Sequence, residues 1–381
     1  MVAMWSAARG PAVLVLAGLA MLAAGSAPDG PGRTPDTAAE SSSRWVPRYS
    51  GPGGGDHPRL RLAATAGGGM SVFVRERRRA GWSLLRWDGA SWRRDPLPAQ
   101  FRGADRLEVG SSPSGETVWA VVTITREDDA TEHLWRLSGG RWSKHLSQDA
   151  TWTGVIDVEV GPRDDAWFVT RMDPDGERSA VLHWDGRAWS HNAPDEFDLT
   201  SAAAGGPDDV WVVAPRLGDR TFHWNGAGWR EVRHPCAGEQ AGPPCRGRPG
   251  LEQSRQAAQA DGQAWLVGPP WPDGGSPVVL HWDRTRWRQV GLSATRTGLT
   301  AVRADPVGGV WIAANPESGA PYVLNLRHGR WTRSTLRAAG PGERIVDVVP
   351  AAGTTRLWVQ TERPGRGRAG TTATSSVYEL A

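Results

Sequence analysis

Two runs of arginine are the side chains in this sequence best suited to bind an anionic ligand. They are Arg75, Arg77, Arg78 and Arg79 in the first run, and Arg363, Arg366 and Arg368 in the second. Guanidinium groups gathered on one surface attract acidic proteins and anionic polymers. The plainer interpretation, which the sequence favours, is that these arginines are solvated loop side chains.

Two tryptophans could bind a sugar or anchor a protein partner. Trp152 and Trp271 lie in polar or proline-rich segments, outside the repeat described below. An exposed indole offers a large flat surface that stacks on sugar rings and fills pockets on a partner protein. Burial against a neighbouring element explains both residues equally well, so the two interpretations stay open.

The two cysteines, Cys236 and Cys245, lie in a segment rich in glycine and proline. In an exported protein such a pair predicts a disulfide, which would add modest stability by restricting the unfolded chain. A metal site is the alternative, but there is no C-x-x-C spacing, and only His234 lies nearby. The sequence therefore favours the disulfide.

Three histidines occupy equivalent places directly before a tryptophan: His183, His223 and His281. Other copies of the same pattern have different polar residues there: Arg86, Arg136, Asn325 and Glu379. A polar position on a strand explains this variation better than a metal centre does. No nucleophile with a base, carboxylate pair or phosphate loop stands out from the repeat, so we predict no catalytic residue, metal or cofactor.

The N-terminus is typical of a secretory signal, which we assign to residues 1–27. Arg9 precedes an apolar run over residues 11–24, and small residues follow it. The run is shorter than the roughly 20 residues that a spanning helix needs, so we expect cleavage, no membrane span in the mature chain, and secretion. An uncleaved N-terminal anchor is the alternative. Residues 28–44 are predicted to be a disordered linker.

Composition and charge favour an all-β protein that does not bind nucleic acid. The sequence has 48 glycines, 29 prolines and 22 tryptophans, which is typical of many turns between short strands. Its net charge of +3 is too small to indicate a nucleic-acid surface.

One three-part pattern recurs seven times. The first part is an apolar strand centred on an aromatic residue: Phe73, Trp119, Trp167, Trp211, Trp265, Trp311 and Trp358. The second is a strand ending in H-W-D-G or a relative, with its tryptophan at Trp87, Trp184, Trp224 and Trp282. The third is a tryptophan five positions later, at Trp92, Trp142, Trp189, Trp229, Trp287 and Trp331. The two tryptophans that flank each turn are expected to pair across a hairpin.

Each copy also has an alternating apolar segment upstream, which makes four strands per repeat. Four short strands in a period of roughly 45 residues are typical of propeller blades. We therefore predict a seven-bladed β-propeller over residues 45–381. The last copy ends at Ala381 without a fourth strand, and residues 45–49 look like an orphan one. Placing this N-terminal strand on the last blade would close the ring.

The V-W-x-V and H-W-D-G-x-x-W repeats resemble those of secreted β-propellers of actinomycete-type bacteria. The blades are distantly similar to those of two-component-regulator and WD-repeat propellers. The resemblance covers residues 45–381 and implies the fold, but it implies no activity. The S-x-D-x-G-x-x-W box of sialidase-type propellers is missing from its expected place between the third and fourth strands.

The long connections of such a ring share one face, which would bring the two arginine runs onto neighbouring blades. Our leading hypothesis is a monomeric, non-enzymatic module that presents this loop-rich face to a protein or cell-envelope partner. One alternative is a carbohydrate-binding propeller that uses Trp152 or Trp271. Another is a hydrolase or lyase with a site in the central channel, which clustered carboxylates and histidines would support.

Overall fold

The computed structural model describes residues 38–52, 60–75, 81–127, 129–149, 154–171, 179–192, 194, 199–214, 220–236, 255–258, 261–268, 277–290, 297–363 and 373–381. The chain divides into two units, Met1–Gly32 and Arg33–Ala381, and all of the described residues belong to the second. The predicted signal lies outside the described residues. Within the described ranges, no helix is long and apolar enough to cross a membrane.

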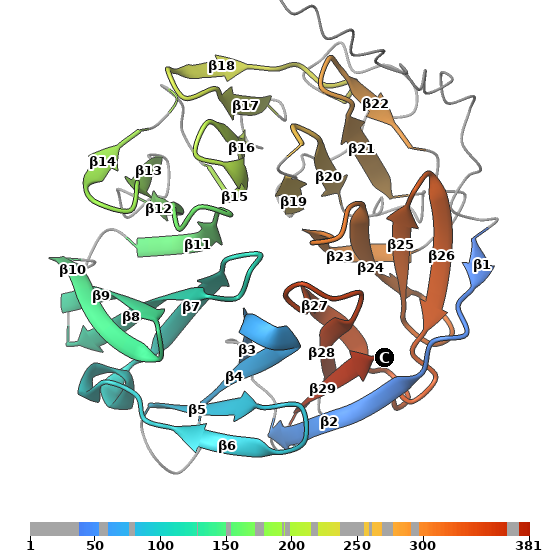
Figure 1. The fold of residues 1–381 in the computed structure, drawn as a ribbon, viewed down its shortest axis with the longest axis horizontal. Helices are drawn as coiled ribbons and strands as arrows, with labels where there is room; N and C mark the ends of the chain where they lie inside the picture. Colours follow the sequence, from blue (N-terminus) through green and yellow to red (C-terminus); the bar gives the residue numbers. More distant parts are fainter. Residues whose placement is uncertain are drawn as a thin grey trace, which may run out of the picture. The chain divides into compact units, whose positions relative to one another are not determined.

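The second unit is a ring of seven four-stranded blades, as predicted (Figure 1). Blade one comprises β3 (Leu60–Thr65), β4 (Gly69–Arg75), β5 (Trp82–Trp87) and β6 (Trp92–Asp95), and blade two comprises β7 (Arg106–Ser111), β8 (Thr117–Arg126), β9 (Asp129–Ser138) and β10 (Arg141–Asp149). Blade three comprises β11 (Gly154–Val160), β12 (Ala166–Arg171), β13 (Ser179–Trp184) and β14 (Trp189–His191). Blade four comprises β15 (Ser201–Gly206), β16 (Asp209–Ala214), β17 (Arg220–Trp224) and β18 (Trp229–Glu231).

Blade five comprises β19 (Arg255–Ala258), β20 (Ala264–Gly268), β21 (Val278–Trp282) and β22 (Trp287–Gln289). Blade six comprises β23 (Thr297–Ala304), β24 (Val310–Pro316), β25 (Tyr322–Arg327) and β26 (Arg330–Thr335). Blade seven comprises β27 (Arg344–Pro350), β28 (Leu357–Arg363), β29 (Thr374–Leu380) and the N-terminal β2 (Trp45–Pro52). Two short 3-10 helices, Ala66–Gly68 and Ala99–Gly103, lie in connections. The strand of each blade that lies nearest the centre of the ring, its inner strand, is β3, β7, β11, β15, β19, β23 or β27 (Figure 1).

The predicted tryptophan pairs lie directly across the outer hairpins. Trp184 is the register partner of Trp189, and their ring centroids are 5.3 Å apart. The same pairing recurs at Trp87 with Trp92, Trp224 with Trp229, and Trp282 with Trp287. Each pair encloses a tight turn that needs a residue with a positive φ, such as Gly186 at 94°. The repeated indoles therefore act in packing.

A second set of tryptophans, which we call the tryptophan belt, fills the interfaces between blades. It comprises the second-strand residues Trp119, Trp167, Trp211, Trp265, Trp311 and Trp358, all of them buried. Trp211 illustrates the contact, because its ring lies 5.1 Å from those of Trp282 and Trp287 on the next blade. Burying a side chain of this size makes each interface strongly apolar. The same contact thus repeats from blade to blade.

The first blade departs from the predicted pattern. Ser71, not Phe73, occupies its belt position, because Ser71 pairs with Arg86 as Trp119 pairs with Arg136. Phe73 lies two residues further along β4. Since side chains alternate along a strand, positions two apart point to the same face, so Phe73 still reaches the interface. There it stacks on Phe101 of the 3-10 helix, with centroids 6.5 Å apart.

The N-terminal strand closes the ring, as predicted. Strand β2 runs antiparallel to β29 and completes the seventh blade, next to the C-terminus in Figure 1. The Arg48 guanidinium lies 2.6 Å from the buried Glu379 carboxylate, and the Trp92 indole of blade one donates a 2.8 Å hydrogen bond to the Arg48 carbonyl. Arg48 also lies over the Trp87 ring. The closing strand therefore contacts both the last blade and the first.

Part of the predicted linker forms a strand. Strand β1 (Ala39–Glu40) pairs in parallel with β26, the outer strand of blade six. The Glu40 carboxylate accepts hydrogen bonds from the backbone N–H and hydroxyl of Thr335. An outer strand exposes unpaired backbone groups, and these give the passing segment a partner. The expectation of disorder over residues 28–44 thus does not hold at these two residues.

Candidate functional site

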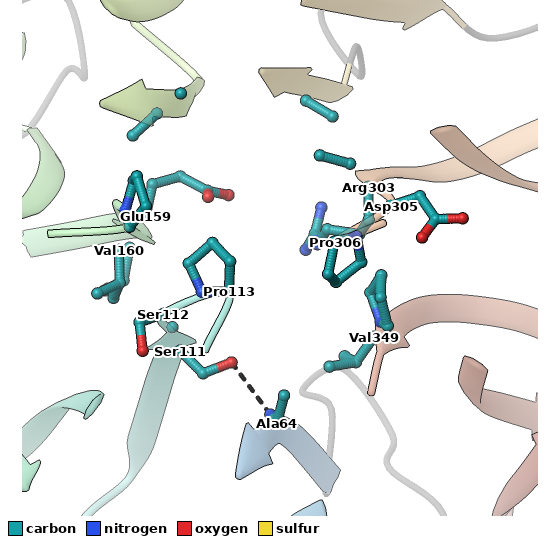
Figure 2. A pocket seen from close by; sticks show the side chains of 18 of the residues that line it. Ala64, Ser111, Ser112, Pro113, Glu159, Val160, Arg303, Asp305, Pro306 and Val349 are labelled. Carbon is teal, nitrogen blue, oxygen red and sulfur yellow. Dashed lines mark hydrogen bonds between the residues drawn. The ribbon is translucent and has the colours of Figure 1, made fainter. Parts of the chain in front are cut away.

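A cavity of about 450 Å³ lies at the centre of the ring, lined by the inner strands of all seven blades (Figure 2). Its lining comes from the C-terminal halves of these strands and from several of the turns that follow them, such as the turn containing Pro113. The volume is within the range of small-ligand sites. These turns lie at the opposite end of the strands from the long connections, so the cavity is not on the predicted loop-rich face.

Most of the wall is built from small or apolar side chains. The inner-strand positions that pair with the belt positions are Ala63, Gly110, Glu159, Ala203, Ala257, Arg303 and Val349. Five of them line the cavity, whereas Ala63 and Ala203 lie in the core. Seven strands converge here, and space is short: a Cβ added to Gly110 would lie 2.5 Å from the Val158 carbonyl oxygen. Small residues at these positions allow neighbouring blades to approach one another. Two of the positions hold charged residues instead.

Glu159 is the first of these charged residues. Its half-buried side chain extends from β11 into the cavity (Figure 2). Among the described residues, its carboxylate has no hydrogen bond or ion pair. Burial raises the pKa of Glu159 from its ordinary value of 4.5 to about 8; Asp157 and Asp347 add to this effect, and Arg303 opposes it. The group therefore holds its proton at pH values where most glutamates are ionised.

Arg303 is the second. It extends into the cavity from β23, on the opposite wall (Figure 2). Its Nη2 lies 3.3 Å from Asp347 Oδ1 on β27, and its Nη1 donates a 3.0 Å hydrogen bond to the Val302 carbonyl. Burial alone would lower the pKa of Arg303, but Asp347 and Glu159 outweigh it, and the pKa is raised. Arg303 thus stays charged and paired with Asp347.

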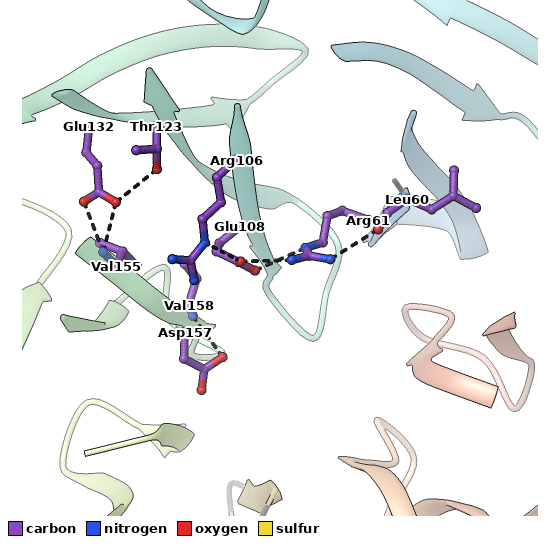
Figure 3. Close-up of polar contacts among 9 residues, drawn as sticks. All are labelled: Leu60, Arg61, Arg106, Glu108, Thr123, Glu132, Val155, Asp157 and Val158. Carbon is purple, nitrogen blue, oxygen red and sulfur yellow. Dashed lines mark hydrogen bonds and ion pairs between the residues drawn. The ribbon is translucent and has the colours of Figure 1, made fainter. Parts of the chain in front are cut away.

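Other polar side chains near the inner strands join neighbouring blades (Figure 3). Glu132 of blade two accepts hydrogen bonds of 3.0 and 3.1 Å from the Val155 N–H of blade three, and burial raises its pKa. Arg61 of blade one lies 2.9 Å from Glu108 of blade two. Asp157 accepts a 2.8 Å hydrogen bond from the Ala202 N–H of blade four. These groups link neighbouring blades of the ring.

The predicted arginine surface falls largely outside the described residues. Arg75 ends β4 and lies 3.7 Å from Asp105, so its charge is partly neutralised. Arg363 ends β28 and is exposed. Five members lie outside the described part of the chain: Arg77, Arg78, Arg79, Arg366 and Arg368. The combined surface stays a prediction.

The predicted tryptophan and cysteine sites also lie mostly outside the described residues. Trp152 and Trp271 are both outside them, so their binding role stays a prediction. Cys236 is buried, whereas Cys245 is outside the described ranges, so their pairing also stays a prediction.

The three equivalent histidines stack on the tryptophan belt. The ring of His183 lies 3.7 Å from that of Trp167, and burial lowers the pKa of His183. The stacking recurs at His223 on Trp211 and at His281 on Trp265. In the described part of the chain, no group of three or more His, Cys, Asp or Glu residues could hold a metal ion.

Glu159, Arg303 and Asp347 were not singled out by the sequence analysis. Glu159 and Arg303 could have been noticed, because the equivalent position in the other five blades is small or apolar. Charge at that position breaks the repeat. Only the ring geometry shows that the position faces a cavity and that blades three and six face each other across it (Figure 1).

No protein-family model matches this sequence, and no curated protein matches it. Among solved structures, the chain is similar to YCF48 bound to D1 peptide, with a TM-score of 0.55 and 12% identity over 90% of this chain and 97% of that one. It is also similar to the β-propeller domain of the Trilobed protease from Pyrococcus furiosus, with a TM-score of 0.51 and 10% identity over 83% and 92% of the two chains.

A third similar structure is that of a prolyl endopeptidase, with a TM-score of 0.51 and 11% identity over 84% of this chain and 50% of that one. The Pyrococcus propeller is described as having an open velcro topology, whereas here β2 closes the last blade. At these identities the similarities show the fold alone: the chain is a seven-bladed β-propeller.

Proposed function

We propose that this chain is a non-catalytic binding module that captures a segment of a protein partner at its central cavity. The observation that carries the proposal is the cavity itself, which has the volume of a ligand site and is lined by all seven blades. Rigid elements on all sides hold its wall in place. Such preorganisation favours binding because little ordering is required when the ligand enters.

The similarity to YCF48 supports a polypeptide as the occupant. That protein is described as bound to a peptide, so a chain of this fold can hold one. The mouth of the cavity here carries exposed prolines, Pro113 and Pro306, from two different blades (Figure 2). Exposed apolar rings around an opening are suited to contact a peptide backbone and its aliphatic side chains.

The experiment below also tests the two alternative functions, carbohydrate binding and hydrolase or lyase activity. The carbohydrate hypothesis rests on Trp152 and Trp271, which are outside the described residues. The hydrolase or lyase hypothesis called for carboxylates and histidines at the centre. The described lining contains carboxylates, among them Glu159 and Asp347, and no histidine.

The decisive experiment is binding of the purified, labelled chain to an array of short peptides of basic, acidic, aromatic and neutral composition, beside insoluble envelope polysaccharides. Three proteins are compared: wild type, Pro113→Trp and Val307→Trp. Pro113 is exposed and lines the cavity, so an indole there should obstruct the mouth. Val307 is 42% exposed and lies outside the lining, which makes it the matched control.

We expect wild type and Val307→Trp to retain the same peptides, Pro113→Trp to lose them, and free monosaccharides to have no effect. Retention on polysaccharide alone, competed by free sugar, would instead establish the carbohydrate-binding function. Turnover of chromogenic glycosides would establish an enzyme.

Export is a separate part of the proposal, supported by the N-terminal sequence of residues 1–27. We expect the chain in the culture medium of an exporting bacterial host, as a monomer that begins near residues 24–27. Intact-mass and sedimentation measurements check this. A full-length chain in the membrane fraction would instead indicate an uncleaved anchor.

A further inference from the structure

We propose that the central cavity binds a guanidinium or alkylammonium group of its ligand, and that the Glu159 carboxylate is the anchor. The inference deepens the proposed function, on which it rests, because it names a basic side chain as the part of the partner that enters the ring. Lysine and arginine residues carry these groups, and so do small free amines and guanidines.

The charges around the cavity leave one carboxylate without a counter-ion. Asp347 is paired with Arg303 at 3.3 Å. Asp305 is paired with Arg327, and Asp261 with Arg284 at 3.1 Å. Among the described lining residues, Glu159 is the remaining carboxylate, and it has no ion pair or hydrogen bond. When Glu159 is ionised, the cavity therefore has one negative charge that a bound cation could neutralise.

The shape of the cavity suits a long basic side chain. Glu159 extends into open space from the wall (Figure 2), and small residues such as Ala204 and Ala257 also line the cavity. Pro113 at the mouth offers apolar surface to an aliphatic stem, while the charged end reaches inward. A hydrogen bond between two charged groups is about twice as strong as one between neutral groups.

In the described part of the chain, most cations on the elements next to Glu159 are paired or distant, and the exception is Arg163, which is exposed on the turn that follows β11. On β7, Glu108 is paired with both Arg61 and Arg106. Strand β15 has no charged residue. Arg171 and Arg126 are exposed at the far ends of β12 and β8, away from the turns that line the cavity.

The charged groups that act on Glu159 are Asp157 on its own strand, and Asp347 and Arg303 across the cavity. In the empty cavity Glu159 has a raised pKa of about 8, so a cation must displace a proton to pair with it. Binding then strengthens as pH rises toward 8 and levels off above it. For one group with this pKa, linkage predicts about a 90-fold gain in affinity between pH 6 and pH 9.

The test uses the full chain and two matched peptides, one with a single central arginine and one with citrulline in its place. Citrulline has nearly the same shape but no charge, and the arginine guanidinium stays charged over this pH range. Affinities are measured by titration calorimetry from pH 6 to pH 9, with methylguanidinium as the small-molecule arm. We expect the arginine peptide to bind, the citrulline peptide to bind at least tenfold more weakly, and about one proton to be released below pH 8.

Three variants separate the role of Glu159 from general effects. Glu159→Gln should lower the affinity for the arginine peptide at least tenfold at pH 9 and abolish the pH dependence of that affinity. Glu116→Gln removes an exposed carboxylate from a turn on the same face, outside the cavity lining. It should change neither the affinity for the arginine peptide nor its pH dependence. Asp347→Asn leaves Arg303 uncompensated, so it should weaken binding and move the midpoint below pH 8. It tests the proposal even if Glu159→Gln does not fold.

The outcomes distinguish this inference from the function on which it rests. If the arginine and citrulline peptides bind equally well, and Glu159→Gln leaves that affinity unchanged, the inference is overturned. The peptide-binding function then stays intact. Binding of methylguanidinium without any peptide would keep the cation site and overturn the peptide function. No binding of either probe would overturn both.

Discussion

The tryptophan belt and the cavity wall are built from equivalent positions of the same seven repeats, but they obey different rules. The belt positions need large side chains to fill the space between blades, and Trp119, Trp167 and Trp211 are fully buried there. The wall needs small residues, because the inner strands converge at the centre. A small wall leaves space for a ligand, and a single charge on it, such as Glu159, then has a large chemical effect.

In a repeat protein, residues that depart from the repeat have different consequences in the packed interfaces and at the centre of the ring. In the belt a residue that departs from the repeat is compensated nearby, as Phe73 and Phe101 compensate for Ser71. In the wall Arg303 is compensated by Asp347 at 3.3 Å, whereas Glu159 has no counter-ion among the described residues. We therefore expect belt substitutions to change stability, and Glu159 and the residues at the mouth of the cavity to change binding.

The largest effect is expected from Trp211→Ala. Trp211 is fully buried against Trp282 and Trp287, so truncation leaves a cavity between two blades. We expect a loss of about 3–5 kcal/mol in the free energy of unfolding. Urea unfolding followed by circular dichroism measures it, with Val307→Ala at an exposed site as the control. A loss under about 1 kcal/mol would contradict the role given to the belt.

The next effect tests the closing strand through Glu379→Ala. Glu379 is buried and pairs with Arg48 on β2 at 2.6 Å and with Arg356 at 2.9 Å. Its removal leaves both guanidinium groups without this partner, and we expect a loss of about 1.5–3 kcal/mol. The same unfolding assay applies. Glu231→Ala, which removes a more exposed ion pair with Arg220, should cost under about 1 kcal/mol, and equal losses would argue against a special role for closure.

A smaller effect, with a definite sign, is expected from Glu159→Gln. The pKa of Glu159 is about 8 in the folded chain and 4.5 ordinarily, so between these values the folded chain holds a proton that the unfolded chain has lost. Ionisation of Glu159 therefore lowers the free energy of unfolding as pH rises from 4.5 to 8. Glutamine cannot ionise, so the variant should gain at least about 1 kcal/mol relative to wild type between pH 5 and pH 9.

Urea unfolding at pH 5, 7 and 9 measures this difference between variant and wild type, which cancels the titration of other groups. Glu116→Gln, at an exposed turn, should show no such trend. A constant difference at all three pH values would mean that Glu159 is an ordinary solvated glutamate.

The smallest effect is expected from Arg75→Ala on the opposite face. Its 3.7 Å pair with Asp105 is partly exposed, and such pairs contribute little. We expect a change within about 0.5 kcal/mol by thermal unfolding. Arg61→Ala, which breaks the 2.9 Å bridge to Glu108 between blades, should cost more. The reverse order would show that the loop-rich face contributes to stability more than the inner bridges do.

The sequence alone determined the ring. Seven copies of one pattern, tryptophans five positions apart around Asp-Gly or Asn-Gly turns, and an orphan strand at the N-terminus were sufficient for the blade count, the hairpin pairing and the closure by β2. These features could be predicted because they depend on local alternation and turn chemistry, which repeat along the chain.

The location of the candidate site became visible in the folded ring. The sequence drew attention to Arg75, Arg363 and their neighbours, whereas the described cavity is at the other end of the inner strands. Glu159 and Arg303 are about 140 residues apart in the chain and face each other because blades three and six lie on opposite sides of the ring. The alternation of a strand tells which residues share a face. Which strand edge borders a cavity, and which charges there remain unpaired, is fixed only when all seven blades come together.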